Sequence, residues 1–146
     1  LILIFFKERK YIFQENVISN LLKIPIILKL KKDESIYWEE KIALFSENSN
    51  IPSDCKNLAL IPLGLIEDEF LSLISSLLKK YLKIKEVKIT NNLIESNSCQ
   101  SQLIISSIGK VSNQEVKSFE ERVSLQKNKP IGIIISDTFS EKNKFF

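Results

Sequence analysis

The chain has 146 residues, enough for one domain with one core, and its 44% hydrophobic and 27% charged content is typical of a globular protein. It contains no histidine and two cysteines, Cys55 and Cys99, which lie far apart in the sequence. This excludes a Cys-His nucleophile pair and a recognisable zinc site. Both cysteines are expected to be small core residues in a reducing compartment. With the incomplete motifs described below, we expect no catalytic residue, no metal and no cofactor.

The net charge of +3 is unevenly distributed. Residues 1–32 hold seven basic and two acidic side chains (+5), and residues 33–146 hold 14 basic and 16 acidic ones (−2). The chain opens with six apolar residues, Leu1–Phe6, followed by Lys7, Arg9 and Lys10. Such a pattern is typical of a transmembrane helix that leaves the bilayer on the cytoplasmic side; the alternative is a buried N-terminal strand. We expect residues 1–12 to be this membrane exit with its basic juxtamembrane segment, residues 13–139 an α/β domain, and residues 140–146 a tail.

The first third of the domain predicts a helix, a strand and a second helix. Apolar residues recur at helical spacing over 13–22, and this helix must end before Pro25 because the residue ahead of a proline avoids the α region. Residues 24–30 (IPIILKL) predict a strand. Asp33 or Ser35 is expected to cap the next helix, which places Trp38 and later apolar residues on one face. Residues 46–54 are polar and predict a loop.

The middle of the chain predicts two strands around one long helix. Residues 56–64 (KNLALIPLG) read as a strand that runs into a turn. The helix that follows has acidic residues in its first turn and lysines in its last, which complements the helix dipole at both ends. Residues 86–90 alternate in polarity and predict a strand at the edge of the sheet, and residues 91–100 have room for one helical turn.

A strand, helix, strand unit is expected over residues 99–139. Two continuous apolar runs, 103–105 and 131–135, flank a helix that begins with a capping box, Ser112 as N-cap and Glu115 three residues later. Strands that are apolar on both faces and joined by helices belong to parallel sheets covered on both sides. The predicted fold is thus α/β, a single three-layer Rossmann-like domain with a mostly parallel sheet of about five short strands flanked by helices.

The turn containing Gly109 and Lys110 has the outline of a phosphate-binding loop. A complete loop reads G-x-x-x-x-G-K-[ST], because several glycines let successive backbone N–H groups surround the phosphates. Here position 104 is isoleucine and position 111 is valine, so the turn is interpreted as a strand-to-helix connection with an exposed lysine. Asp137, at the end of the last apolar run, is interpreted as a turn residue or cap rather than a ligand. Gly109, Lys110 and Asp137 are weak candidates for a cofactor site.

The basic N-terminal residues raise two possible partners, nucleic acid and a membrane surface. The rest of the chain is net negative and contains no recognisable nucleic-acid-binding motif. Proximity to anionic lipid explains the same charges. We therefore expect a membrane surface as the partner of Lys7, Arg9 and Lys10, and no nucleic acid.

Three segments, 1–27, 56–64 and 101–137, resemble in order and spacing the cytoplasmic part of bacterial polysaccharide co-polymerases and their fused tyrosine autokinases. This resemblance implies a degenerate, P-loop-like kinase domain on the cytoplasmic face of the inner membrane. It also implies a role in the chain length of exopolysaccharide, capsule or O-antigen, with further copies of the chain and polysaccharide assembly proteins as partners. The chain departs from the family where nucleotide chemistry would lie. No glycine occurs between Ile24 and Gly64, and Asn91 replaces an expected acid. The expected function is therefore non-catalytic. The alternatives are a nucleotide-binding domain, ATPase or tyrosine-kinase-like, that uses Lys110 and Asp137, and a soluble protein-interaction module.

Overall fold

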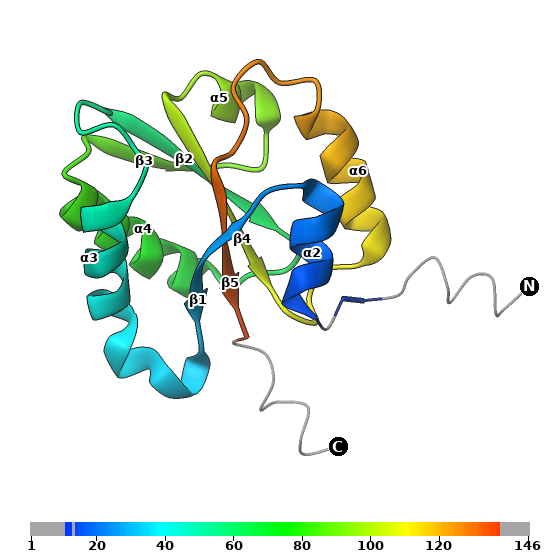
Figure 1. The fold of residues 1–146 in the computed structure, drawn as a ribbon, viewed down its shortest axis with the longest axis horizontal. Coiled ribbons are helices and arrows are strands. Elements are labelled where there is room, and N and C mark those ends of the chain that lie inside the picture. The colour runs from blue at the N-terminus through cyan, green and yellow to red at the C-terminus, as the bar shows by residue number, and fades with distance from the viewer. Residues whose placement is uncertain (1–10, 13, 138–146) are drawn as a thin grey trace, which may run out of the picture.

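The computed structural model describes residues 11, 12 and 14–137, which form one five-stranded parallel sheet with helices on both faces (Figure 1). In chain order the elements are α2 (Glu15–Leu22), β1 (Ile26–Leu30), the 3-10 helix η1 (Lys32–Tyr37), α3 (Trp38–Asn48), β2 (Asn57–Leu63), α4 (Asp68–Leu82), β3 (Glu86–Ile89), α5 (Leu93–Asn97), β4 (Ser101–Ser107), α6 (Asn113–Val123) and β5 (Gly132–Ser136). The predicted single α/β domain is confirmed. All four strand pairs are parallel, whereas a mostly parallel sheet was expected.

The strand order is β1-β5-β4-β2-β3, so the first and third strands are the edges of the sheet. Every residue of β4 and β5 is buried, which is why each strand contains a continuous apolar run, 103–105 and 133–135, rather than an alternating pattern. The alternating strand β3 lies at an edge, as its pattern predicted.

The sheet separates two hydrophobic cores. On one face α3 and α4 pack against β-strand side chains such as Leu58 and Leu103, and the Trp38 and Phe70 rings meet edge to face with centroids 5.2 Å apart. On the other face, α2 and α6 pack against the strand side chains that alternate with these along the sequence, including Ile104. Helix α6 buries one apolar stripe, Val116, Phe119 and Val123, in this second core. Cys55 and Cys99 are free and buried, as expected.

Two helix boundaries differ from the prediction. Neither Asp33 nor Ser35 caps α3; both belong to η1, and the N-cap of α3 is Tyr37, which makes no side-chain capping bond. The cause is a kink at Glu34, whose backbone leaves the helical region, and a hydrogen bond from Trp38 Nε1 to the Lys31 carbonyl (2.8 Å) that holds the start of α3 against the end of β1. The helix then continues to Asn48, into the predicted loop.

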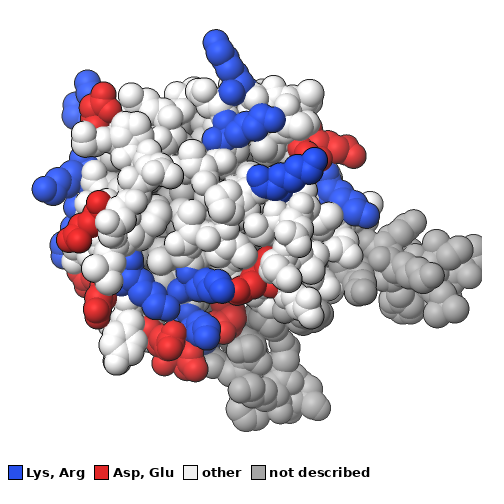
Figure 2. Space-filling view, in the orientation of Figure 1, with Lys and Arg blue, Asp and Glu red and all other residues white. Residues whose placement is uncertain are grey.

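In the view of Figure 2, acidic and basic side chains gather on the left and lower parts of the molecule, and the middle of the face is mostly uncharged. Within residues 11–12 and 14–137, no helix is both long and apolar enough to span a bilayer. The predicted membrane exit, Leu1–Phe6 with Lys7, Arg9 and Lys10, lies outside the described residues, and so does the tail 140–146.

The carboxyl edge of the sheet as the candidate functional site

The carboxyl ends of all five strands meet at one edge of the sheet, because every pair is parallel. At this edge β2 leads into α4 on one face, while its neighbour β4 leads into α6 on the other. Neighbouring strands whose connections leave to opposite faces form a topological switch point, the usual ligand-binding position in open α/β sheets. In this fold the switch point lies between the ends of β2 and β4.

The turn that follows β4 contains Gly109 and Lys110, and its backbone N–H groups are engaged within the protein. The Ile108 N–H donates to the Ser136 carbonyl (2.8 Å), the Gly109 N–H to the Ile12 carbonyl (2.8 Å), and the Lys110 N–H to the Ser107 carbonyl (3.1 Å). Three successive donors that a phosphate loop would direct at its ligand thus bind carbonyl groups instead.

The Tyr11–Ile12 segment completes this arrangement from the N-terminal side. The Ile12 N–H donates to the Val111 carbonyl (2.9 Å), and Tyr11 forms an isolated antiparallel bridge with Ser112. Ile12 itself is buried, with 3% of its surface exposed. The chain therefore enters the domain along the β4–α6 turn.

The turn after β2 contacts the same segment. The Leu65 N–H donates to the Lys110 carbonyl (3.1 Å), and Gly64 has a φ of +88°. A Cβ atom on Gly64 would lie 2.6 Å from the Lys110 carbonyl oxygen and 2.9 Å from Val111 Cβ. Glycine is required here both by the backbone conformation and by the close approach of the two turns.

Asp137 lies at the end of β5, next to the end of β1. Its Oδ1 accepts a hydrogen bond from the backbone N–H of Lys32 (2.8 Å), so the carboxylate joins β5 to the first residue of η1. Among residues 11–12 and 14–137, no group of three or more acidic or cysteine side chains could hold a metal ion.

Comparisons with protein-family models, curated proteins and solved structures gave no match. The function must therefore be argued from the geometry of this edge.

A groove of about 550 Å³ lies beside these turns, on the α6 side of the sheet. The end of β2 forms its floor and α6 forms one wall. Asn91, which follows β3, contributes to the opposite wall. The described residues that line it are Pro62, Leu63, Gly64, Asn91, Ser112, Gln114, Glu115, Ser118, Phe119 and Arg122.

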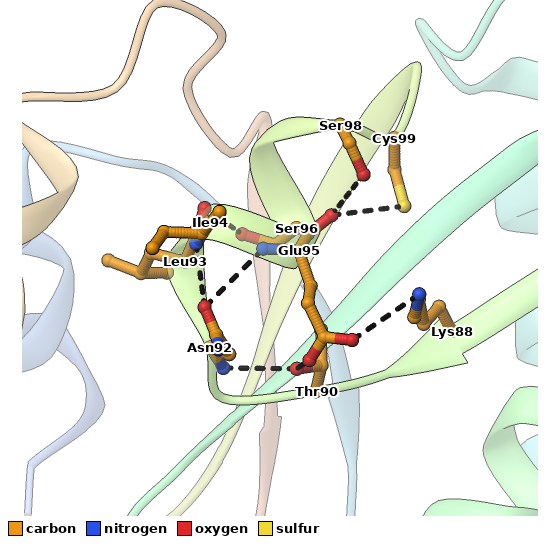
Figure 3. A network of polar contacts seen from close by, with 9 residues as sticks. All are labelled: Lys88, Thr90, Asn92, Leu93, Ile94, Glu95, Ser96, Ser98 and Cys99. Carbon is orange, nitrogen blue, oxygen red and sulfur yellow. Dashed lines mark hydrogen bonds and ion pairs between the residues drawn. The ribbon is translucent and has the colours of Figure 1, made fainter.

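The segment that carries Asn91 is held by the polar network around α5 (Figure 3). Asn92 caps α5 through Oδ1, which accepts from the Ile94 N–H (2.9 Å). Thr90 Oγ1 donates to Glu95 (2.9 Å), and Lys88 forms an ion pair with the same carboxylate (3.4 Å). These contacts, the Thr90 hydrogen bond first, lower the pKa of Glu95 below its ordinary value. The turn after β3 is therefore fixed by its own side chains.

Helix α6 is positioned by its capping box and by its buried stripe. Ser112 Oγ accepts from the Glu115 N–H (3.1 Å), and Glu115 Oε1 accepts from the Ser112 N–H (3.0 Å). With Val116 and Phe119 buried against the sheet, the neighbouring ridge carries Glu115, Ser118 and Arg122 into the groove.

The candidate residues predicted from the sequence lie at this edge of the sheet but outside the groove. Gly109, Lys110 and Asp137 all follow strands at this edge, yet none of the three lines the groove. The polar ridge of α6 was missed. A signal was present, because these polar residues occur at the same helical spacing as the buried stripe, one position earlier.

Proposed function

We propose that the chain is a non-catalytic α/β domain of a membrane protein that regulates the length and export of a bacterial surface polysaccharide. In this proposal the domain lies on the cytoplasmic face of the inner membrane, with the N-terminal basic segment at the lipid surface. Its partners are further copies of the chain and polysaccharide assembly proteins, and no nucleic acid is involved.

The engagement of the β4–α6 turn is the observation that carries the non-catalytic part of the proposal. Phosphate loops need several backbone N–H groups directed at the ligand. Here the donors of Ile108, Gly109 and Lys110 bind carbonyl groups of the protein itself. The carboxamide of Asn91 stands where a magnesium-binding carboxylate would be needed. Both features favour a scaffold over a nucleotide-hydrolysing domain.

The path of the chain supports the membrane part of the proposal. Tyr11 and Ile12 lie against the β4–α6 turn, so the segment that follows the basic cluster is bound to the carboxyl edge by paired backbone hydrogen bonds. Any movement passed along the chain to Tyr11 and Ile12 would therefore reach the carboxyl edge of the sheet directly.

The role in chain-length control is tested in the native host. Deleting residues 14–137 from the full-length protein is expected to shift the modal length of the surface polysaccharide on a gel, whereas Lys110→Ala should leave the length distribution unchanged. An unchanged distribution after the deletion would contradict the polysaccharide role. A Lys110→Ala phenotype equal to that of the deletion would favour a nucleotide-dependent domain instead.

A further inference from the structure

We propose that the groove between α6, the end of β2 and Asn91 binds a small, hydroxyl-rich compound with one anionic group, and that Arg122 binds the anion. The shared chemistry is that of a sugar acid or a sugar phosphate. This inference concerns the groove alone and does not depend on the role proposed above.

The position and size of the groove support a ligand site. It lies beside the switch point between β2 and β4, where open α/β sheets bind their ligands. Its volume, about 550 Å³, is within the range of small-molecule pockets, roughly 300–1,000 Å³. Gly64 lines the groove, and the turn that it begins is joined to the neighbouring β4–α6 turn by the hydrogen bond from the Leu65 N–H to the Lys110 carbonyl (3.1 Å).

Arg122 is the one cation among the described residues that line the groove. Its Nε donates to the Ser118 carbonyl (3.4 Å), and its guanidinium lies 5.6 Å from the centre of the Phe119 ring. No carboxylate within the described part of the chain forms an ion pair with it. The terminal nitrogens of the guanidinium thus remain for a carboxylate or phosphate, which an arginine fork can bind with two hydrogen bonds.

Neutral polar groups surround this cation. The side chains of Asn91, Gln114 and Ser118 line the groove and make no hydrogen bond with any described residue. Amide and hydroxyl groups both donate and accept, so together they match a ligand with several hydroxyl groups. Glu115 uses one oxygen in the capping box and retains acceptor capacity for a hydroxyl hydrogen.

The charge pattern excludes several other ligand classes. One cation, Arg122, and one anion, Glu115, lie about 10 Å apart along the helix axis, seven residues at 1.5 Å each. A polyphosphate would need further cations or unpaired backbone donors. A nucleobase would need an open aromatic face, but Phe119 is 2% exposed and Arg122 lies over its ring. A single anionic group on a hydroxylated ring fits both the charge and the polarity.

The test uses the 146-residue protein and four probes: glucuronate, glucose 1-phosphate, glucose and acetate. Calorimetry measures affinity, and amide chemical shifts locate the site. Saturable binding of glucuronate or glucose 1-phosphate, with shifts centred on residues 112–122 and Asn91, is expected, and glucose and acetate should bind at least about tenfold more weakly because each offers only part of the contacts. Binding of glucuronate alone identifies a sugar acid, and binding of glucose 1-phosphate alone identifies a sugar phosphate.

Two variants and one matched control separate this site from general charge attraction. Arg122→Gln is expected to weaken binding by about tenfold or more, and Ser118→Leu, which fills the groove, should do the same. Lys117→Gln removes a cation from the same helix but outside the groove and should leave affinity unchanged. All three positions are exposed, so the melting temperature should change little. No saturable binding of either anion, shifts located elsewhere, or equal losses in the Arg122 and Lys117 variants would overturn the proposal.

Discussion

Replacing Gly64 with alanine tests the contact between the two turns at the carboxyl edge. The residue has a φ of +88°, and the new Cβ would lie 2.6 Å from the Lys110 carbonyl oxygen, a backbone atom that cannot rotate away. A non-glycine residue in a strained backbone conformation costs about 1–3 kcal/mol, and displacement of the neighbouring turn adds to this. We expect a loss of about 3 kcal/mol in the free energy of unfolding. That loss corresponds to a fall of roughly 6–12 °C in melting temperature for a chain of this size.

Denaturant unfolding measures this loss, provided that the dependence of the unfolding free energy on denaturant concentration is the same in the variant and the wild type. Gly64→Asn separates the two causes, because asparagine tolerates positive φ better than alanine but carries the same Cβ atom. If the contact with the Lys110 carbonyl dominates, both variants should be similarly destabilised. A loss below about 1 kcal/mol for the alanine variant would refute the close contact, and a near wild-type asparagine variant would leave only the backbone conformation as the cause.

Three further changes test contacts in separate parts of the fold. Ser112→Ala removes the N-cap of α6 and should lower the unfolding free energy by about 1 kcal/mol, measured by denaturant titration. Tyr81→Phe removes the hydrogen bond that the Tyr81 hydroxyl of α4 donates to the Glu39 carboxylate of α3, the main cause that lowers the pKa of Glu39, so the titration of this carboxyl followed by NMR should move to higher pH. In the wild type, the stabilisation from this carboxylate is present above its unfolded pKa and is lost as the pH falls through the lower folded value. Gly132→Ala places a Cβ 2.6 Å from the Ile27 side chain and should lower the free energy of unfolding. In the double variant, Ile27→Ala should recover part of this loss, measured by denaturant titration, whereas two independent effects would simply add.

Much of the fold follows from patterns that are local in the sequence. The fully apolar runs at 103–105 and 131–135 indicated central parallel strands, and both strands prove buried on both faces. The capping box at Ser112 fixed the start of α6 because both of its hydrogen bonds are made by residues three positions apart. The predicted start of α3 was wrong, because Asp33 and Ser35 lie within η1, where the backbone leaves the helical region at Glu34.

The candidate site was less predictable, because its contacts join distant parts of the chain. Gly109 and Lys110 lie at the same edge as the groove, but the hydrogen bonds from Gly109 to Ile12 and from Leu65 to Lys110 link segments separated by many residues. No periodicity or motif encodes such pairs. The strand order that brings Asn91 opposite α6 was likewise beyond local patterns, since it depends on which strands become neighbours.

The central claim is that the carboxyl edge is closed to nucleotide chemistry, and calorimetric titration of the 146-residue protein with Mg-ATP tests it most directly. The engaged N–H groups of Ile108, Gly109 and Lys110 predict no saturable heat and no ATP hydrolysis. Micromolar binding that Lys110→Ala abolishes would contradict the account, because it would require the turn to release Ile12, Ser107 and Ser136 and accept a phosphate in their place.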